Sequence, residues 1–262
     1  MTPTSVGVVP DAVRATLPVG APTEVPGPGA DETDTARSPR VTPDPTSSPV
    51  RLLVMDVDST LIEQEVIELL ADHAGTRAEV TEVTERAMRG EIDFGASLRE
   101  RVATLAGVPV EAFADVRARA TFTPGVRELV AEAHRRGWEV ALVSGGFEEI
   151  VADLAAELGI TRFRANRLEV AGGRLTGRTT GPVVDRAAKE VALREFAAEL
   201  GLPMSATIAV GDGANDLDMI GAAGIGVAFA AKPVVRAQAP YGVDGPRIDA
   251  VLEVVDQVDS AR

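Results

Sequence analysis

Two aspartates separated by one residue, Asp56 and Asp58, stand at the end of the apolar run 52–55. Alternate residues of a strand point to the same side, so these two carboxylates would lie close enough to repel each other. Such a pair is costly unless a cation or a shared proton relieves the repulsion. Because α/β sheets bind ligands at the carboxyl ends of their strands, we expect a strand over residues 52–57 with a ligand site at its end.

A second acidic motif, Gly-Asp-Gly-Ala-Asn-Asp-Leu-Asp, occupies residues 211–218 directly after the apolar run 207–210. Its carboxylate and amide side chains are hard oxygen donors of the kind that bind Mg²⁺, and its glycines allow tight turning. An acidic turn that caps a helix is the simpler explanation. The position at a strand end and the density of carboxylates favour metal binding by this motif.

Two further segments could bind a phosphate. Ser144-Gly145-Gly146 follows the expected strand 139–143 and opens a helix, so it offers a hydroxyl and approachable backbone N–H groups. Lys189 lies in residues 185–193, which have a helical pattern. Each signal is weak alone, because Ser-Gly-Gly is also an ordinary turn and most helical lysines are solvated.

Four apolar runs, each followed by a polar or glycine-rich loop and a helical pattern, predict an α/β fold. They are residues 52–57, 139–143, 207–210 and 226–229. Repeated strand–loop–helix units predict a doubly wound parallel sheet, a Rossmann-like core with helices on both faces. Residues 167–176 alternate around Gly172-Gly173 and predict a β-hairpin instead.

The chain divides into three predicted parts. Residues 1–50 hold ten of the 17 prolines and predict a disordered tail. Residues 51–74 and 121–262 would form the catalytic core. Residues 75–120 contain helical spacing without a strand signal, which predicts a small helical cap inserted after the first strand–helix unit, above the carboxyl edge of the sheet.

Composition limits the partners. The net charge of −14 disfavours nucleic acid and anionic membranes, and 45% hydrophobic residues can build a large core. The chain has no cysteine, which fits a reducing compartment. The uncharged stretch 219–231 is shorter than the roughly 20 residues of a spanning helix. With no basic and apolar leader pattern at the N-terminus, we expect a cytoplasmic protein with a small-molecule substrate; the oligomeric state stays open.

The order of these motifs resembles the haloacid dehalogenase-like phosphohydrolase superfamily. Within it, the chain from 51 to about 255 is similar to the phosphoserine phosphatases. The similarity rests on Asp-Ser-Thr-Leu-x-x-x-Glu at 58–65, Met-Arg-Gly-Glu-x-x-Phe at 88–94, Ser-Leu-Arg-x-Arg-Val at 97–102 and Gly-Asp-Gly-Ala-Asn-Asp-Leu-x-Met at 211–219. Two features depart from the family: Val57 stands where Phe is frequent, and residues 1–50 do not have the pattern of a regulatory amino-acid-binding domain.

The resemblance implies a catalytic mechanism. Asp56 would be the nucleophile that forms an aspartyl-phosphate, and Asp58 the general acid and base. Mg²⁺ would be bound by the carboxylates of Asp56 and Asp212 and by the backbone carbonyl of Asp58, with Asp216 mainly supporting these ligands. Ser144 and Lys189 would hold the remaining phosphoryl oxygens.

The resemblance also implies the contacts to O-phosphoserine. Arg101 would bind the carboxylate and Glu65 the ammonium group. An apolar lid would come from Met88 and Phe94, and two further contacts from the backbone of Gly145 and the side chain of Asn215. The sequence pattern alone would predict that Arg101 is a surface arginine and that Met88 and Phe94 are packing residues.

Three alternatives stay open at this point. One is a phosphatase for another small phosphomonoester, such as phosphohomoserine or a phosphosugar, which would use the same phosphate chemistry. Another is a phosphoacceptor signalling domain, although its nucleophile usually ends the third strand and it has no inserted cap. The last is a catalytically inactive binding protein, which the presence of every required charged group disfavours.

Overall fold

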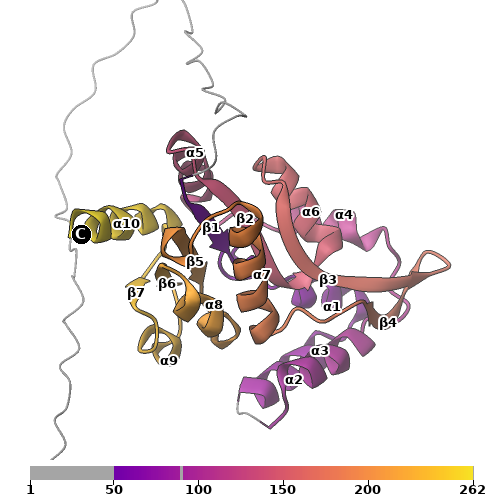
Figure 1. Ribbon diagram of the computed structural model, residues 1–262. Helices are drawn as coiled ribbons and strands as arrows, with labels where there is room; N and C mark the ends of the chain where they lie inside the picture. The colour runs from indigo at the N-terminus through magenta and orange to yellow at the C-terminus, as the bar shows by residue number, and fades with distance from the viewer. Residues whose placement is uncertain (1–49, 89–90, 262) are drawn as a thin grey trace, which may run out of the picture. The chain divides into compact units, whose positions relative to one another are not determined.

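A seven-stranded sheet forms the centre of the computed structural model, which describes residues 50–88 and 91–261 (Figure 1). All described residues belong to one unit, 41–262, of the two into which the chain divides. Of the predicted tail, residues 1–49 lie outside the described part. The strands are β1 (Leu52–Met55), β2 (Glu139–Phe147), β3 (Arg162–Ala171), β4 (Arg174–Thr180), β5 (Thr207–Gly211), β6 (Ile225–Phe229) and β7 (Tyr241–Val243). Their spatial order is β4-β3-β2-β1-β5-β6-β7, and every neighbouring pair is parallel except the antiparallel β3 and β4.

Helices cover both faces of this sheet, because the central strands are apolar on both sides. In β1, Leu53 and Met55 belong to one core cluster and Leu52 and Val54 to the other. The first cluster contains side chains of α1 (Val66–Ala74), α5 (Val126–Arg135), α6 (Glu148–Glu157) and α10 (Val251–Ser260). The second contains side chains of α7 (Arg186–Glu199) and α8 (Leu217–Ala222). The predicted doubly wound α/β fold is confirmed.

The structure corrects several predicted element bounds. The first strand ends at Met55 instead of residue 57, so Asp56 and Asp58 follow the strand rather than continue it. The strand after the serine motif is longer than predicted: β2 continues through Phe147, and α6 begins only at Glu148. Our strand assignments also missed β7 and the first half of β3. Only three residues form β7, and arginines interrupt the start of β3, so neither gives an apolar run.

The predicted hairpin is confirmed between β3 and β4. Gly172 and Gly173 form its two-residue turn with φ values of 58° and 73°. Positive φ at both central positions is the geometry that favours glycine and that matches the twist of the two strands.

Three helices occupy the inserted segment: α2 (Arg77–Met88), α3 (Phe94–Ala103) and α4 (Ala112–Arg119). In Figure 1, α2 and α3 lie together as a pair at the lower edge of the view. The segment after α3 is bound to the hairpin through backbone hydrogen bonds, from Gly107 N–H to Leu175 O (2.8 Å), Leu175 N–H to Val108 O (2.9 Å) and Val110 N–H to Gly173 O (3.0 Å). The hairpin therefore fixes one end of the insertion, whereas the division into cap and core stays a prediction.

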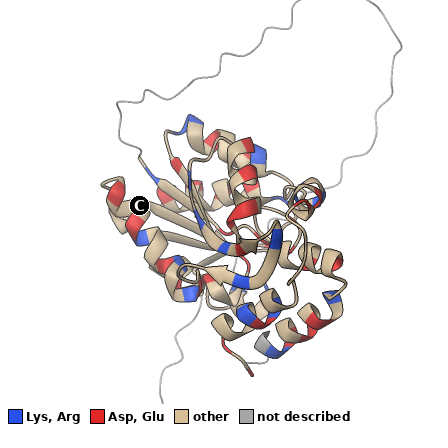
Figure 2. Cartoon of the chain, turned by 90° about the vertical axis from the view of Figure 1, so that its right-hand side faces the viewer, with Lys and Arg blue, Asp and Glu red and all other residues tan. Residues whose placement is uncertain are grey.

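Short elements complete the described chain: α9 (Pro233–Arg236) and the 3-10 turns η1 (Met204–Ala206), η2 (Ala214–Asp216) and η3 (Ile248–Ala250). Within the described ranges, every helix is too short or too polar to cross a bilayer. Positive and negative residues are interspersed over the elements in Figure 2, and many form exposed ion pairs such as Arg162–Glu199 (2.7 Å). Exposed pairs of this kind contribute little each to stability.

Candidate active site

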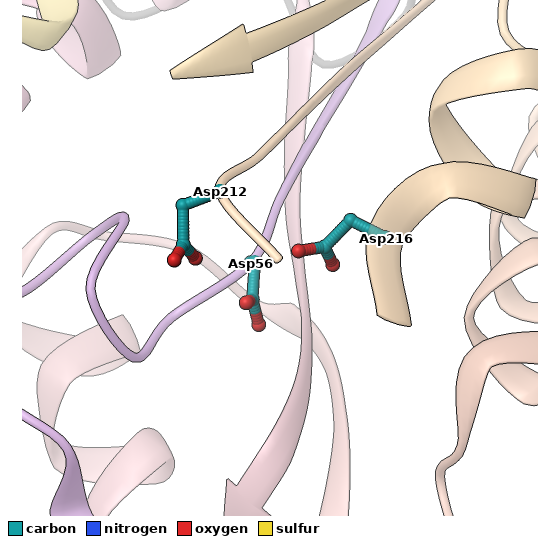
Figure 3. A group of neighbouring side chains, drawn as sticks. All are labelled: Asp56, Asp212 and Asp216. Atoms are coloured by element: carbon teal, nitrogen blue, oxygen red, sulfur yellow. The ribbon is translucent and has the colours of Figure 1, made fainter. Parts of the chain in front are cut away.

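Three carboxylates converge at the carboxyl edge of the sheet (Figure 3). Asp56 follows β1, Asp212 follows β5, and Asp216 ends η2. Parallel pairing brings them together, because Met55 lies opposite Val210 and the Asp56 N–H donates to Val210 O at 2.9 Å. One oxygen of each carboxylate lies within 4.8 Å of the other two. This spacing suits a single small cation held by hard oxygen ligands.

Lys189 is completely buried between two of these carboxylates. Its Nζ lies 2.7 Å from Asp56 Oδ1 and 2.7 Å from Asp216 Oδ1. The second oxygen of Asp216 accepts the Gly213 N–H at 3.0 Å. Burial alone would lower the pKa of Lys189, but Asp216 and Asp56 outweigh it and raise that pKa. Lys189 is therefore a buried cation of the site and not the solvated lysine that its helical position alone suggests.

The site holds more negative charge than Lys189 can neutralise. Burial and then the charge of Asp216 raise the pKa of Asp56 well above its usual range, and the same two causes raise the pKa of Asp212 to about 7. A divalent cation would relieve this repulsion. The donor set, carboxylates without any thiolate or imidazole, fits Mg²⁺ better than a softer metal.

Asp58 lies on the turn that follows Asp56 and is half-buried. Its Oδ1 accepts the Val66 N–H at 3.2 Å at the start of α1. Burial and then the charge of Glu65 raise the pKa of Asp58 to about 8. A carboxyl group with that pKa can hold a proton at neutral pH and release it, as a general acid and base requires. Its Oδ2 lies 2.7 Å from where a Cβ on Gly146 would stand, so a larger residue there would displace the Asp58 side chain.

Ser144 and the two glycines after it lie beside Asp58. Ser144 is completely buried, and its Oγ accepts the Gly146 N–H at 2.8 Å. That hydrogen bond uses an acceptor position of the hydroxyl and leaves its proton for another acceptor. We expected this segment to open a helix, which is wrong: it continues β2, whose pairing with β3 shifts register between Val143 and Phe147.

A cavity of about 690 Å³ connects the carboxylates with the inserted helices. Most of the predicted site residues line it: Asp56, Asp58, Glu65, Phe94, Arg101, Gly145, Asp212 and Asn215. Ser144, Lys189 and Asp216 are buried next to these residues without lining the cavity. The side chain of Met88, also predicted to contact substrate, lies outside the described part of the structure.

Arg101 and Glu65 face the cavity from opposite segments. Arg101 is half-buried on α3, where its Nε donates to Ser97 O at 3.4 Å. Burial lowers its pKa, while the charges of Glu65 and Asp58 act in the opposite direction. Glu65 immediately precedes α1, and the Ser59 hydroxyl donates to its Oε1 at 2.7 Å. Arg101 is thus directed inward and is not a surface arginine.

The inserted helices also contact the segment Ser144-Gly145-Gly146. The ring atom Cζ of Phe94 lies 3.1 Å from the position of a Cβ on Gly145. A larger residue at 145 would push Phe94 away, so the glycine allows the insertion to close over the strand end.

Several residues of this region were not predicted from the sequence. The cavity is also lined by Ser59, Ile67, Glu68, Thr84, Ile92, Ser97, Arg186 and Lys232. Behind the cavity, Asn166 is buried and donates from Nδ2 to Gly145 O at 2.8 Å. The one available signal for Asn166 is that asparagine is unfavourable in a strand and needs a reason to be there.

Comparison with known proteins agrees with this geometry. The family model of the haloacid dehalogenase-like hydrolases matches residues 53–220. The phosphoserine phosphatase of Streptococcus thermophilus is 56% identical over 207 residues, which are 79% of this chain and 96% of that relative. The phosphoserine phosphatase of Streptomyces coelicolor is also 56% identical, over 202 residues, but the match spans only 49% of that longer protein.

Solved structures show the same fold. A structure described as a phospho-aspartyl intermediate analogue of phosphoserine phosphatase has a TM-score of 0.75 at 38% identity, covering 79% of this chain and 99% of that one. A substrate-bound phosphoserine phosphatase complex has a TM-score of 0.74 at 38% identity, covering 78% of this chain and 97% of that one. The chain belongs to the haloacid dehalogenase-like hydrolases, within the group of that family whose curated members are phosphoserine phosphatases.

Proposed function

We propose that this protein is a Mg²⁺-dependent phosphatase that hydrolyses O-phosphoserine to serine and phosphate through an aspartyl-phosphate on Asp56. The main support is one cavity that brings together several groups. These are the buried carboxylate of Asp56 with its paired Lys189, and the charged side chains of Arg101 and Glu65, which suit the two charged groups of an amino acid. The similarity to phosphoserine phosphatases over 79% of the chain supports the same substrate. In this role the enzyme would act in the cytoplasm as the last step of serine biosynthesis.

Charge decides how the first step proceeds. A carboxylate and a phosphomonoester dianion repel each other, so the nucleophile needs cations around the phosphoryl group. Bound Mg²⁺, ligated by the carboxylates of Asp56 and Asp212 and the backbone carbonyl of Asp58 and supported by Asp216, would neutralise both partners and stabilise the charge of the transferring group. Lys189 and Ser144 would hold the other phosphoryl oxygens while Asp56 attacks phosphorus.

Asp58 would handle the proton in both steps. The leaving group from O-phosphoserine is an alkoxide, which needs a proton as the bond to phosphorus breaks. A carboxyl group whose pKa is raised to about 8 can donate that proton, and afterwards it can accept one from the water that hydrolyses the aspartyl-phosphate.

The amino-acid end of the substrate gives the specificity. Arg101 can bind a carboxylate through two parallel hydrogen bonds, and Glu65 can accept from the ammonium group. Phe94 and the backbone of Gly145 would close over the substrate, with Asn215 as a further polar contact and Met88 as a further lid residue. A phosphosugar leaves Arg101 and Glu65 without partners, which disfavours that alternative.

The signalling alternative finds no support in this fold. The proposed nucleophile follows the first strand rather than the third, and inserted helices line the cavity above it.

Product analysis tests the proposal directly. With O-phosphoserine and Mg²⁺ we expect serine and phosphate in equal amounts, and with excess EDTA we expect neither. Phosphoglycolate and phosphohomoserine assayed side by side measure the specificity. A rate on phosphoglycolate comparable to that on O-phosphoserine contradicts the proposed substrate.

A further inference from the structure

Asn166 connects two segments that are far apart in the sequence and both touch the proposed phosphate site. Its side chain is 1% exposed and lies on β3. Nδ2 donates to Gly145 O at 2.8 Å, and Oδ1 accepts the Val184 N–H at 2.8 Å. Both partners are backbone groups. The Asn166 amide therefore supplies to each of them the hydrogen bond that a neighbouring strand would otherwise supply.

The first hydrogen bond fixes the peptide between Gly145 and Gly146. Its carbonyl accepts from Asn166, and its N–H donates to Ser144 Oγ at 2.8 Å. A peptide held at both ends cannot rotate, although two glycines would otherwise make it the most flexible part of the strand end. The fixed N–H in turn directs the Ser144 hydroxyl proton away from Gly146.

The second hydrogen bond fixes the start of α7. Val184 immediately precedes Asp185, whose side chain caps the helix by accepting the Ala188 N–H at 2.9 Å. Lys189 lies one turn into that helix, and its N–H donates to Asp185 O at 3.0 Å. A displacement of Val184 would therefore be transmitted to the lysine that is paired with Asp56.

We infer that Asn166 is a positioning residue that holds Ser144 and Lys189 at the spacing required to bind one phosphoryl group. The inference rests on the proposed function only in that both groups contact a phosphate, and it holds for any phosphomonoester substrate. Asn166 itself does not line the cavity, so it acts through Gly145 and Val184.

Substitutions of Asn166 distinguish a positioning role of this side chain from a packing role. Asn166→Ala removes both hydrogen bonds, and Asn166→Asp keeps the side-chain size and the acceptor for Val184 while losing the donor to Gly145. For both variants, we expect kcat on p-nitrophenyl phosphate and on O-phosphoserine to fall roughly 10- to 100-fold with a smaller change in KM, since small misplacements of catalytic groups have effects of that size.

Glu149→Ala is the matched control. Glu149 lies on α6 and also binds a backbone group of β3, because its Oε1 accepts the Leu168 N–H at 3.0 Å. In the described part of the chain, the Glu149 side chain forms no hydrogen bond to Gly145 or to the start of α7. We expect Glu149→Ala to lower the melting temperature with kcat within about twofold of the parent enzyme.

A double-mutant cycle between Asn166→Ala and Ser144→Ala gives the sharpest result. If Asn166 acts through Ser144, the fold-decrease in kcat of the double variant is much smaller than the product of the fold-decreases of the two single variants. Unchanged kcat in folded Asn166→Ala and Asn166→Asp, or independent losses in the cycle, overturns the inference. The proposed function fails separately, if the parent enzyme hydrolyses p-nitrophenyl phosphate but not O-phosphoserine.

Discussion

At the scale of single residues, the proposed mechanism gives different roles to two neighbouring carboxylates. Asp56 is paired with Lys189 at 2.7 Å, which opposes the rise in its pKa that burial and the charge of Asp216 cause. Within the described part of the chain Asp58 forms no ion pair of this kind, and burial and then the charge of Glu65 raise its pKa to about 8. In the proposed mechanism, Lys189 and a bound Mg²⁺ would keep Asp56 ionised as the nucleophile, and Asp58 would carry the proton.

We predict that Asp58→Asn slows formation and hydrolysis of the aspartyl-phosphate, because the amide cannot donate and accept the proton. The expected loss in kcat is roughly 10²- to 10⁴-fold, the usual contribution of general acid–base catalysis. Rapid-quench kinetics with O-phosphoserine measures both steps, and substrate binding measured by calorimetry should persist. Loss of binding with an unchanged rate for bound substrate would contradict the role.

We predict that Arg101→Ala raises KM for O-phosphoserine roughly 10- to 100-fold, since a charged hydrogen-bonded pair is lost. O-phosphoethanolamine lacks the carboxylate, so its KM should change little. Arg99→Ala is the control, because Arg99 is exposed on the same helix and does not line the cavity. An equal rise in KM for both substrates would contradict the proposed contact between Arg101 and the substrate carboxylate.

Most of the candidate site could be predicted because its residues stand in short motifs. Asp56 and Asp58, or Asp212 and Asp216, are close in sequence and follow apolar runs, so their types and spacing are informative. Asn166 could not be predicted, because its partners Gly145 and Val184 are 21 and 18 residues away and are backbone groups without a residue-type signal.

At the scale of elements, strand ends bring the motifs together and glycines allow the close contacts. The parallel direction of strands such as β1, β2 and β5 could be inferred from the alternation of strands and helices, whereas their order in the sheet could not. The continuation of β2 through Ser144 to Phe147 could not, because it depends on pairing with β3, which gives no apolar signal of its own.

We predict that Gly146→Ala nearly abolishes activity. A Cβ there would stand 2.7 Å from Asp58 Oδ2 and 3.0 Å from Ser144 Oγ, so both side chains would have to move. The expected loss of stability is roughly 1–3 kcal/mol, as for other overpacked sites. Gly221→Ala on α8 is the control: nothing lies within 4 Å of its Cβ position, and it should retain activity.

The two variants differ in their expected effect on melting. Gly221→Ala should stabilise the protein by about 0.5–1 kcal/mol, because alanine favours a helix interior over glycine. Thermal melts and initial rates measured on the same preparations provide the comparison. Normal activity of Gly146→Ala would show that Asp58 and Ser144 do not need this close packing.

At the scale of the whole molecule, the buried carboxylates link stability to pH and to metal. The pKa of Asp58 is about 8 and that of Asp212 about 7 in the folded protein. Both exceed the value of about 3.9 expected in the unfolded chain, so the folded state binds more protons between these limits. The free energy of unfolding of the metal-free protein should therefore fall as pH rises from about 4 to about 8.

We predict that Mg²⁺ raises the melting temperature more at about pH 8 than at about pH 5.5, because it replaces protons on the same carboxylates. The Glu132 carboxylate does not contribute in this window: Arg135 and Arg136 hold the pKa of Glu132 near 2, so its contribution changes only in more acidic solution. Differential scanning fluorimetry with and without Mg²⁺ over this pH range measures the shift in melting temperature. A larger shift at the acidic end would contradict the prediction.

The most direct test of the central claim is to quench the enzyme during turnover of O-phosphoserine labelled in its phosphate and to locate the label by peptide mass spectrometry. We predict a base-labile acyl-phosphate on Asp56 that requires Mg²⁺ and is absent from Asp56→Asn, which should be inactive. Label on any other residue, or full turnover by Asp56→Asn, would contradict the account.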